Sequence, residues 1–281
     1  MNLRDARALV TGASGGIGAA IVREIVGCGG KALITGRDAQ SLRQLARSID
    51  ANGNCLAVHA ADITRECDRN GLVEAAAAWC GGVNVLVNNA GVASFGAFAK
   101  MRSEDLEHSL AVNVLAPMQL CRALLSHLQR QPAAHIVNIG SVFGAIGYPG
   151  QAAYSASKFA LRGFSEALRR ELGDTALRVH YLAPRATRTS FNCAAIEELN
   201  MQLAVATDPP ERVAATVRRM LETGRVEATI GWPEKLFVRI NGILPWLVDR
   251  SLARQLPIIQ ERFARPHAPQ SSIQPVSREA S

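Results

Sequence analysis

Tyr154 and Lys158 are the two residues of this sequence whose types and spacing best fit proton-transfer chemistry. They stand four apart in a segment, residues 151–170, whose spacing predicts a helix, so both side chains share one helix face. A free tyrosine has a pKa of about 10 and is a poor base at neutral pH. A cation close to the phenol favours the phenolate and lowers that pKa. Tyr154 could then donate a proton to a carbonyl oxygen or remove one from an alcohol. Taken alone, such a pair is more often an ordinary surface pair.

A glycine-rich loop lies near the start of the chain, where residues 11–18 read Thr-Gly-Ala-Ser-Gly-Gly-Ile-Gly. Glycines let a backbone come close to a pyrophosphate, and a helix N-terminus offers free N–H donors and positive potential. An ordinary strand-to-helix turn is the alternative, but the strand predicted before the loop and the helix predicted after it favour a dinucleotide site. The predicted cofactor contacts in this loop are Gly12, Ser14, Gly15, Gly16, Ile17 and Gly18.

Five motifs follow one another in a fixed order along the chain. They are the Thr-Gly-x-x-x-Gly-x-Gly spacing of the loop, Asn88-Asn89-Ala90-Gly91, Asn113, Ser141 and Tyr154-x-x-x-Lys158. Each motif is weak alone, but together, over residues 7 to about 190, they resemble the short-chain dehydrogenase/reductase family. The resemblance implies a Rossmann-like single domain, a nicotinamide cofactor, and redox chemistry between carbonyl and alcohol carbons.

The same resemblance implies roles for individual side chains. Tyr154 is expected to be the acid/base, and Lys158 to hold the nicotinamide ribose as well. Ser141 is expected to orient the substrate oxygen, and Asn113 to bend its helix and hold a water that links the lysine to solvent. The predicted catalytic group is therefore Asn113, Ser141, Tyr154 and Lys158. Of these, Ser141 and Tyr154 are expected to contact the substrate, and no metal ion is expected.

The end of the second predicted strand bears on the choice of nicotinamide. Dinucleotide-binding folds place the ribose 2′-position there, roughly 20 residues past the loop. Gly36 stands where NAD-preferring members of the family resemble one another in carrying Asp, and Arg37 offers a planar donor fork to a 2′-phosphate. NADP(H) is therefore the predicted cofactor. Arg37 could instead be a surface residue, and Asp38 either the N-cap of the next helix or, if the alignment is off by two, an acidic ribose ligand.

Further residues at the cofactor are implied by the resemblance. Asp62 resembles the residue that meets the adenine ring, and it could also cap a helix beginning near Thr64. Asn89 and Thr189 match family positions at the cofactor, Thr189 beside the nicotinamide carboxamide. Arg185 departs from the pattern, because it follows Pro where the family usually has Gly. Its side chain could point outward without a role, or reach an anionic group on the substrate or cofactor.

These residues need a scaffold of alternating strands and helices. Short apolar runs predict strands at residues 8–11, 32–35, 55–59, 83–87, 135–139 and 179–182, with a last strand closed by residues 230–233. Helical patterns lie between them, as where Leu42, Leu45 and Ile49 recur at i, i+3 and i+7. Such alternation predicts an α/β fold with a doubly wound parallel sheet, whose ligands bind at the carboxyl ends of the strands. Residues 1–233 are predicted to be one Rossmann-like dinucleotide-binding and catalytic domain.

The C-terminal part follows a different pattern. Residues 234–265 are predicted to form an amphipathic helical extension, broken or kinked at Pro245. Its predicted apolar face is Leu236, Phe237, Ile240, Ile243, Leu244 and Leu247. Beside that face lie Trp232, Trp246, Lys235, Arg239 and Arg250. This composition fits peripheral contact with a membrane surface. Packing over the pocket or against a second subunit fits equally well. The Pro- and Ser-rich residues 266–281 are predicted to be disordered.

Composition narrows the remaining interpretations. The net charge of +7 is spread along the chain with no basic stripe interleaved with aromatic residues, so it fits an anionic cofactor or surface, and nucleic-acid binding is not predicted. Six cysteines without metal-ligand or redox spacing are interpreted as small core residues in a reducing compartment. We find neither a signal peptide nor an apolar run of about eighteen residues. A cytoplasmic location, with or without peripheral membrane contact, is expected.

The predicted activity is NADP(H)-dependent hydride transfer. Small and apolar residues dominate the predicted pocket segments, residues 93–98, 144–151 and 191–206. Phe95, Phe143 and Phe191 are candidate walls, which favours a hydrophobic substrate that is lipid-like, ketoacyl, steroid or retinoid-like. The family resemblance implies a homodimer or homotetramer formed through helices at residues 103–129 and 153–171. The alternative is a non-catalytic NADP(H)-binding sensor or scaffold, which would be expected to lose Tyr154 or Lys158.

Overall fold

A computed structural model describes residues 1–263, and the segment predicted to be disordered, residues 266–281, lies outside the described residues. The strands are β1 (Arg7–Thr11), β2 (Lys31–Gly36), β3 (Leu56–Ala60), β4 (Val85–Asn88), β5 (Ala134–Ile139), β6 (Leu177–Ala183) and β7 (Glu227–Thr229). They form one parallel sheet in the order β3-β2-β1-β4-β5-β6-β7. The order reverses between β1 and β4, as in a doubly wound sheet, so the predicted fold class is confirmed.

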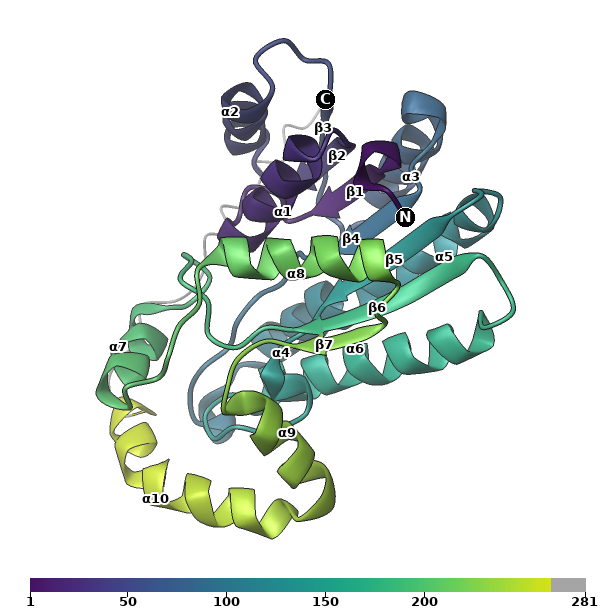
Figure 1. The fold of residues 1–281 in the computed structure, drawn as a ribbon. Coiled ribbons are helices and arrows are strands. Elements are labelled where there is room, and N and C mark those ends of the chain that lie inside the picture. The colour runs from purple at the N-terminus through teal and green to yellow at the C-terminus, as the bar shows by residue number, and fades with distance from the viewer. Residues whose placement is uncertain (264–281) are drawn as a thin grey trace.

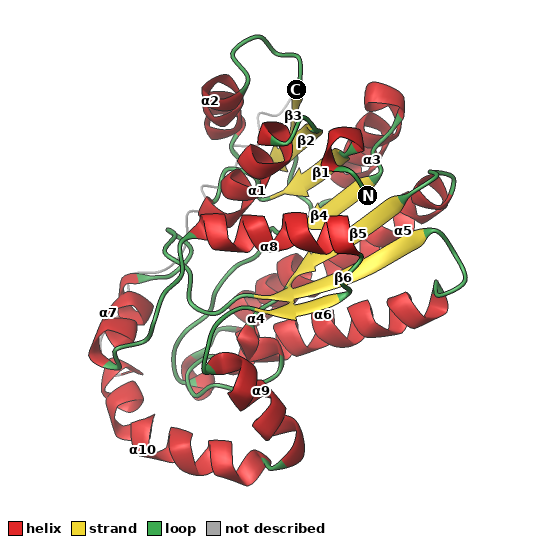
Figure 2. Ribbon diagram, viewed as in Figure 1, coloured by secondary structure: helices red, strands yellow, loops and turns green. Residues whose placement is uncertain are grey.

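Helices cover both faces of the sheet (Figures 1 and 2). One face packs against α1 (Gly16–Gly27), α2 (Ala39–Ile49) and α8 (Pro210–Thr223). The other face packs against α3 (Glu66–Ala78), α5 (Ala116–Gln129) and α6 (Ala152–Glu171). Alternate residues of a strand point to opposite faces, and in β1 Ala8 and Val10 enter the first core while Leu9 enters the second. This explains why the strands read as continuous apolar runs.

The predicted strands occur with small shifts at their ends. β4 begins at Val85 rather than at residue 83, and β7 ends just before the predicted residues 230–233. The interpretation of the cysteines as core residues is wrong for most of them. Only Cys121 is buried, and burial raises the pKa of its thiol to about 12, whereas Cys67 and Cys80 are exposed. All six cysteines are free.

Within residues 1–263, one helix is long and apolar enough to cross a membrane by length and composition. It spans residues 103–129, joining α4 (Ser103–Leu110), a π-helical turn (Ala111–Leu115) and α5. Leu120, Leu124 and Leu128 of this helix are fully buried against the sheet. Core helices of this kind meet the same criterion, so the helix is accounted for by the fold.

The described part of the chain ends in two helices beyond the sheet, α9 (Glu234–Ile243) and α10 (Pro245–Phe263), here called the C-terminal arm. Leu244 separates the helices and Pro245 begins the second, so the predicted break is confirmed. Figure 1 shows α10 returning toward α7 (Ala194–Gln202), where Arg262 pairs with Glu198.

Candidate active site

A cavity of about 680 Å³ lies at the carboxyl ends of the strands. The glycine loop and the ends of β2 and β3 line one part of it. The segments after β4, β5 and β6 line the rest, together with residues of α6, α7 and the C-terminal arm. All predicted site residues except Asn113 line this cavity. The structure therefore brings together side chains that lie up to 177 positions apart, from Gly12 to Thr189.

The glycines of the loop are required by close packing as well as by any ligand. A Cβ on Gly18 would lie 2.3 Å from the Gly12 carbonyl oxygen, and one on Gly16 would lie 2.5 Å from Thr189 Cγ2. Gly12 has a φ of +62°, a backbone conformation that favours glycine. The first turn of α1 has neither a side-chain cap nor an acidic residue. Its N–H groups are therefore open to an anion at the end of the cavity.

The loop is braced by the two residues at the ends of β1 and β4. Asn89 Nδ2 donates to the carbonyl oxygens of Thr11 and Gly12, at 3.0 Å each. Thr11 Oγ1 accepts the N–H groups of Asn89 and Ala90, also at 3.0 Å. The Asn89 amide thus acts on the cavity through the loop. The sequence analysis predicted no role for Thr11, although its position as the first residue of the glycine motif could have indicated one.

The part of the cavity at the end of β2 distinguishes Arg37 from its neighbour Asp38. Arg37 is exposed and lines the cavity, and no described residue forms an ion pair or hydrogen bond with its guanidinium. Asp38 caps α2, accepting the N–H groups of Gln40 at 2.9 Å and Ser41 at 3.3 Å. The hydrogen bond from the Ser41 hydroxyl and these backbone bonds hold the pKa of Asp38 below its usual value. Its carboxylate is therefore engaged by the helix N-terminus, as predicted for an N-cap.

The predicted capping role of Asp62 needs correction. α3 begins at Glu66 and its N-cap position is Arg65, which forms no side-chain cap. Asp62 Oδ1 instead accepts the N–H and the hydroxyl of Thr64, at 2.9 and 2.6 Å. The carboxylate fixes the turn before the helix, because short polar side chains readily bond the backbone two residues on. Asp62 still lines the cavity.

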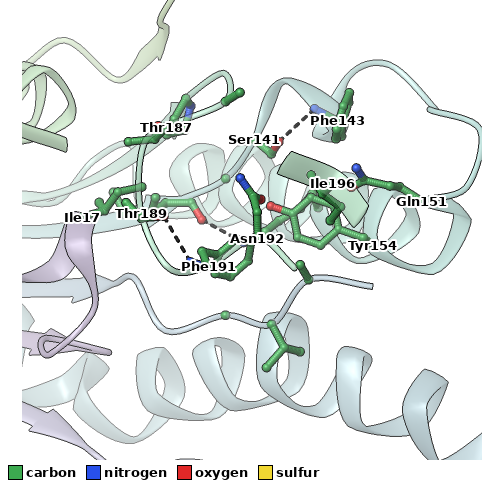
Figure 3. A pocket seen from close by; sticks show the side chains of 18 of the residues that line it. Ile17, Ser141, Phe143, Gln151, Tyr154, Thr187, Thr189, Phe191, Asn192 and Ile196 are labelled. Carbon is green, nitrogen blue, oxygen red and sulfur yellow. Dashed lines mark hydrogen bonds between the residues drawn. The ribbon is translucent and has the colours of Figure 1, made fainter. Parts of the chain in front are cut away.

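Tyr154 and Lys158 lie on the buried face of α6, exposed by only 8% and 4%. Lys158 Nζ is 5.7 Å from the centroid of the Tyr154 ring and donates to the Ile139 carbonyl oxygen at 3.1 Å. Figure 3 shows the Tyr154 hydroxyl directed into the cavity near Ser141 and Asn192. The surface-pair alternative therefore does not apply to these residues.

Burial changes the acidity of both groups. It raises the pKa of Tyr154 to about 12, against the opposing effect of a hydrogen bond with Ser141. It lowers the pKa of Lys158 to about 8. At neutral pH the phenol therefore keeps its proton and the ammonium keeps most of its charge. The pair is set up as a proton donor beside a cation, and a second positive charge would be needed to favour the phenolate.

Asn113 is fully buried, in the π-helical turn of residues 111–115. Its Oδ1 accepts the Val92 N–H at 2.8 Å, and its Nδ2 donates to the Val92 carbonyl oxygen at 2.9 Å and to Ser157 Oγ at 3.0 Å. π-turns often mark functional positions in helices. Here the turn lets the Asn113 amide connect the segment after β4 to α6, at Ser157, the residue before Lys158. Ser157 was not foreseen from the sequence.

Ser141 is held by a residue from the neighbouring strand. Its Oγ accepts the Phe143 N–H at 3.1 Å. The Tyr181 hydroxyl lies between the Ser141 N–H, at 3.4 Å, and the Ser141 carbonyl oxygen, at 3.3 Å. A Cβ on Gly140 would lie 2.2 Å from the Tyr181 ring. Tyr181 is a positioning residue that sequence reasoning missed, because only the pairing of β5 with β6 reveals it.

Arg185 does not point outward without a role, because it lines the cavity and two carboxylates hold its side chain. Its Nε and Nη2 donate to the two carboxylate oxygens of Asp208, at 2.9 and 3.0 Å, and its Nη1 lies 3.4 Å from Glu234 Oε2. The Arg185 and Asp208 side chains are only 11% and 4% exposed. Burial raises the pKa of Asp208, but Arg185 and Arg212 outweigh it and hold that pKa below its usual value. Arg185 thus ties the loop after β6 to the start of the C-terminal arm.

The remaining part of the cavity has mostly apolar walls. Phe143 and Phe191 line it as predicted, whereas Phe95 does not and packs on Phe263 instead, with ring centroids 5.8 Å apart. The C-terminal arm adds Phe237, Val248, Leu252 and Gln255 to the lining, which agrees with the predicted alternative that the arm packs over the pocket. The polar side chains of the lining include His108, Tyr148, Gln151, Arg185, Asn192, Asn200, Glu234 and Ser251. Among residues 1–263 no cluster of His, Cys, Asp and Glu could hold a metal ion.

The sequence comparison and the structure comparison agree on the kind of protein that this chain resembles. The sequence profile described as short chain dehydrogenase matches residues 6–200. The oxidoreductase YxnA of Bacillus subtilis is 30% identical over 273 residues, which cover 95% of this chain and 76% of YxnA.

Two solved structures are similar to this one over most of the chain. A 3-ketoacyl-(acyl-carrier-protein) reductase from Brucella melitensis, complexed with NADH, has a TM-score of 0.76 at 25% identity, covering 83% of this chain and 99% of that one. A metagenomic short-chain oxidoreductase in complex with NADP has a TM-score of 0.68 at 32% identity, covering 80% and 96%. The two neighbours were solved with different nicotinamides.

Proposed function

The chain belongs to the short-chain dehydrogenase/reductase family of nicotinamide-dependent oxidoreductases, and from that premise we propose that it transfers hydride between NADP(H) and a hydrophobic carbonyl or alcohol. Tyr154 is the proposed acid/base, acting with Ser141, Lys158 and Asn113. The observation that carries the proposal is the single cavity that joins the open N-terminus of α1 to the Tyr154 hydroxyl.

The residues of the cavity fit a dinucleotide. Gly12, Ser14, Gly15, Gly16, Ile17, Gly18, Asn89 and Thr189 line the part that would hold the pyrophosphate and nicotinamide. Asp62 also lines the cavity and is the residue proposed to meet the adenine. Lys158 would hold the nicotinamide ribose. The bound nicotinamide supplies or accepts the hydride.

Arg37 supports NADP(H) over NAD(H). Its guanidinium is exposed at the adenosine end, has no partner within residues 1–263, and follows Gly36, so no acidic side chain faces it from that position. Asp38, which could repel a 2′-phosphate, is engaged in capping α2. A planar guanidinium that is free of carboxylates is suited to binding phosphate through two hydrogen bonds.

The chain's own residues account for the proton transfer. In reduction, Tyr154 Oη donates its proton to the substrate oxygen while the Ser141 hydroxyl holds that oxygen in place. The phenolate that forms is stabilised by the Lys158 ammonium close to its ring. Asn113 keeps the segment after β4 against α6 and so keeps Lys158 beside the cavity. In oxidation the same proton travels the other way, from the alcohol to Tyr154 Oη.

The walls of the cavity support a hydrophobic substrate. Phe143, Ile196 and Leu199 line the cavity, and the C-terminal arm adds further apolar side chains. Because apolar surface predominates in the lining, a lipid-like, ketoacyl, steroid or retinoid-like carbonyl fits better than a sugar or a polyacid. The similarity to a 3-ketoacyl reductase is in line with a ketone on an apolar chain.

Self-association is supported by apolar side chains on the outside of two helices. Leu110, Leu115 and Met118 are 40%, 52% and 38% exposed along the helix of residues 103–129, and Phe159 of α6 is 44% exposed. An interface that repeats the same patch on both subunits would bury them. We propose a homodimer, or a homotetramer built from it, through these two helices.

The proposal is tested by following NADPH oxidation with a panel of carbonyl compounds. The panel runs from short water-soluble ketones to ketoacyl thioesters, steroids, retinal and sugars. Turnover that increases with the apolar surface of the carbonyl compound is the expected result. Tight NADPH binding with no turnover on any class would instead favour a non-catalytic NADP(H)-binding sensor or scaffold.

A further inference from the structure

The two helices of the C-terminal arm each have an inner and an outer face. On α10, Val248, Leu252 and Gln255 recur at i, i+4 and i+7 and line the cavity. On α9, Phe237 lines the cavity and Asn241 Nδ2 donates to the Ala145 carbonyl oxygen at 2.8 Å. These contacts fix which side of each helix faces the protein. The opposite sides form an outer surface with an unusual composition.

Large apolar side chains are concentrated on this outer surface. Half of the large hydrophobic residues that are exposed in the described part of the chain lie between residues 232 and 247, and all of these except Phe237 lie outside the cavity lining. Ile243 is 78% exposed, Trp232 70% and Trp246 57%. Single exposed apolar residues are normal, but a group of this size within one short segment indicates a binding surface.

Basic residues share the same faces of the two helices. Lys235 and Arg239 precede Ile243 at steps of four on α9, and Arg250 follows Trp246 by four on α10. With Arg254, which is also exposed, they make four cations on this surface. No residue within 1–263 pairs with any of their side chains. The carboxylate of Glu234 is already engaged by Arg185. Asp249, exposed three positions after Trp246 on α10, offsets one of the four cations and leaves the surface net positive.

We propose that this outer surface binds an anionic lipid bilayer peripherally. It consists of Trp232, Lys235, Leu236, Arg239, Ile243, Trp246, Leu247, Arg250 and Arg254. Tryptophans beside long basic side chains suit the boundary between headgroups and acyl chains. A second copy of the chain fits this surface less well, because a self-complementary interface would bring like charges together.

The geometry requires the arm to lie along the membrane rather than across it. α9 has 10 residues, and α10 has 19 with charged side chains on its outer face. A spanning helix needs about 20 predominantly apolar residues. In a peripheral orientation, one helix layer, about 10 Å thick, separates the lipid from the cavity. Taken with the proposed activity on hydrophobic carbonyls, this places the cavity where a membrane-dissolved substrate could enter it.

The test is flotation of the full-length protein with vesicles. Vesicles of phosphatidylcholine mixed with phosphatidylglycerol should carry the protein upward in a density gradient, and vesicles of phosphatidylcholine alone should carry much less. Removing two cations in Arg239→Gln/Arg250→Gln should weaken partition roughly 30-fold, since each basic residue near an anionic surface contributes about 1 kcal/mol. Trp246→Ser/Ile243→Ser should weaken partition to both kinds of vesicle.

Matched controls separate this surface from general charge and apolarity. Arg43→Gln/Arg47→Gln removes two exposed cations from α2, and Met201→Ser removes a side chain that is 73% exposed on α7. Both control variants should float like the unmodified protein. Failure of the unmodified protein to float, or equal losses in the test and control variants, would overturn the proposal. So would light scattering that shows the outer-surface variants dissociating a dimer, because the surface would then contact a second copy.

Flotation with vesicles can be measured whether or not the protein has the proposed enzyme activity. The outer-surface variants should turn over a water-soluble carbonyl as the unmodified protein does, since none of the four substituted residues lines the cavity. If no carbonyl is turned over but the protein floats as expected, the proposed function fails and the lipid surface stands. If turnover is found without flotation, the lipid proposal alone is wrong.

Discussion

The cofactor part and the substrate part of the cavity are built in different ways. Around the glycine loop there is no room for a Cβ at Gly12, Gly16 or Gly18, and Thr11 and Asn89 bind the backbone directly. The C-terminal arm, in contrast, is held to the domain by separate polar contacts and by two buried apolar side chains, Val248 and Ile259. The ends of the strands therefore position the reacting groups, while an element outside the sheet shapes what can be bound.

The largest effect on turnover is expected at Tyr154, where the cofactor part and the substrate part of the cavity meet. Tyr154→Phe removes the proton donor but keeps the ring, so turnover should fall by about a thousandfold or more. The dissociation constant for NADPH should change little, because the ring remains in place beside Lys158. Steady-state kinetics and a fluorescence titration measure the two quantities separately. Full activity in this variant would remove Tyr154 from the mechanism.

The attachment of the arm is tested by Arg185→Ala. This change leaves the buried Asp208 carboxylate with Arg212 alone, and breaking a buried ion pair typically costs about 3–5 kcal/mol. We expect a loss near the lower end, about 3 kcal/mol in the free energy of unfolding, measured by urea denaturation. Arg212→Ala, which removes a cation that is 53% exposed from the same carboxylate, should cost much less. Equal costs would contradict the assignment of Arg185 as the main tie.

Within the cofactor part, Arg37→Ala tests the choice of nicotinamide. Loss of a hydrogen bond to a charged group is worth about 1.5–3 kcal/mol, so NADPH should bind roughly 10- to 150-fold more weakly. NADH, which has no 2′-phosphate, should be almost unaffected. Isothermal titration with both cofactors decides the matter, and equal losses would show that Arg37 does not read the 2′-phosphate.

The sheet itself should set an acid limit on stability. His135 Nδ1 and His180 Nε2 are 2.8 Å apart and buried, and His180 Nδ1 is 2.8 Å from the Arg225 carbonyl oxygen. Burial lowers the pKa of His180, and burial together with His180 lowers the pKa of His135 to about 3.

In the unfolded chain a histidine has a pKa of about 6.5, so below that pH the unfolded state binds more protons than the folded state. Stability is therefore full above pH 6.5 and falls as the pH drops. His135 alone should account for about 2 kcal/mol between pH 6.5 and 5. Urea unfolding at several pH values measures the slope. His135→Leu/His180→Leu should flatten it, whereas the same slope in that variant would assign the effect to other groups.

The smallest effect is expected from a single contact of the arm. Asn241→Ala removes the hydrogen bond to the Ala145 carbonyl oxygen, typically worth about 1 kcal/mol. Because α9 contributes Phe237 to the cavity, KM for a bulky carbonyl should increase while the dissociation constant for NADPH stays the same. Kinetics with a bulky and a small carbonyl separate the two effects. An equal change for both substrates would mean that the arm does not shape the substrate part.

The contrast between the cofactor part and the substrate part of the cavity explains which residues could be predicted from the sequence. Gly12 to Gly18, Ser141 and the Tyr154–Lys158 spacing are local patterns tied to strand and helix ends, so their place in one cavity follows from the parallel sheet. Tyr181 and Asp208 act on residues 40 and 23 positions away, and no local spacing connects them to Ser141 and Arg185.

The C-terminal arm shows why other contacts of the site could not be predicted from the sequence. The sequence grouped Phe237 with Ile243 on one apolar face, but Phe237 lines the cavity and Ile243 faces outward. The break at Leu244 was expected from Pro245, yet the direction of each helix depends on contacts with Ala145, Arg185 and α7. A periodic sequence pattern shows which residues share a face of a helix. The elements that pack against the helix determine which of its faces is buried.

The most direct test of hydride transfer at Tyr154 uses NADPH that carries deuterium at the transferred position. With an apolar ketone, the unmodified protein should yield an alcohol whose carbinol carbon carries the deuterium, as read by mass spectrometry. Tyr154→Phe should bind the labelled cofactor and yield none above background. Tight binding of the labelled cofactor by the unmodified protein, with no deuterium in any carbonyl-derived product, would contradict the account.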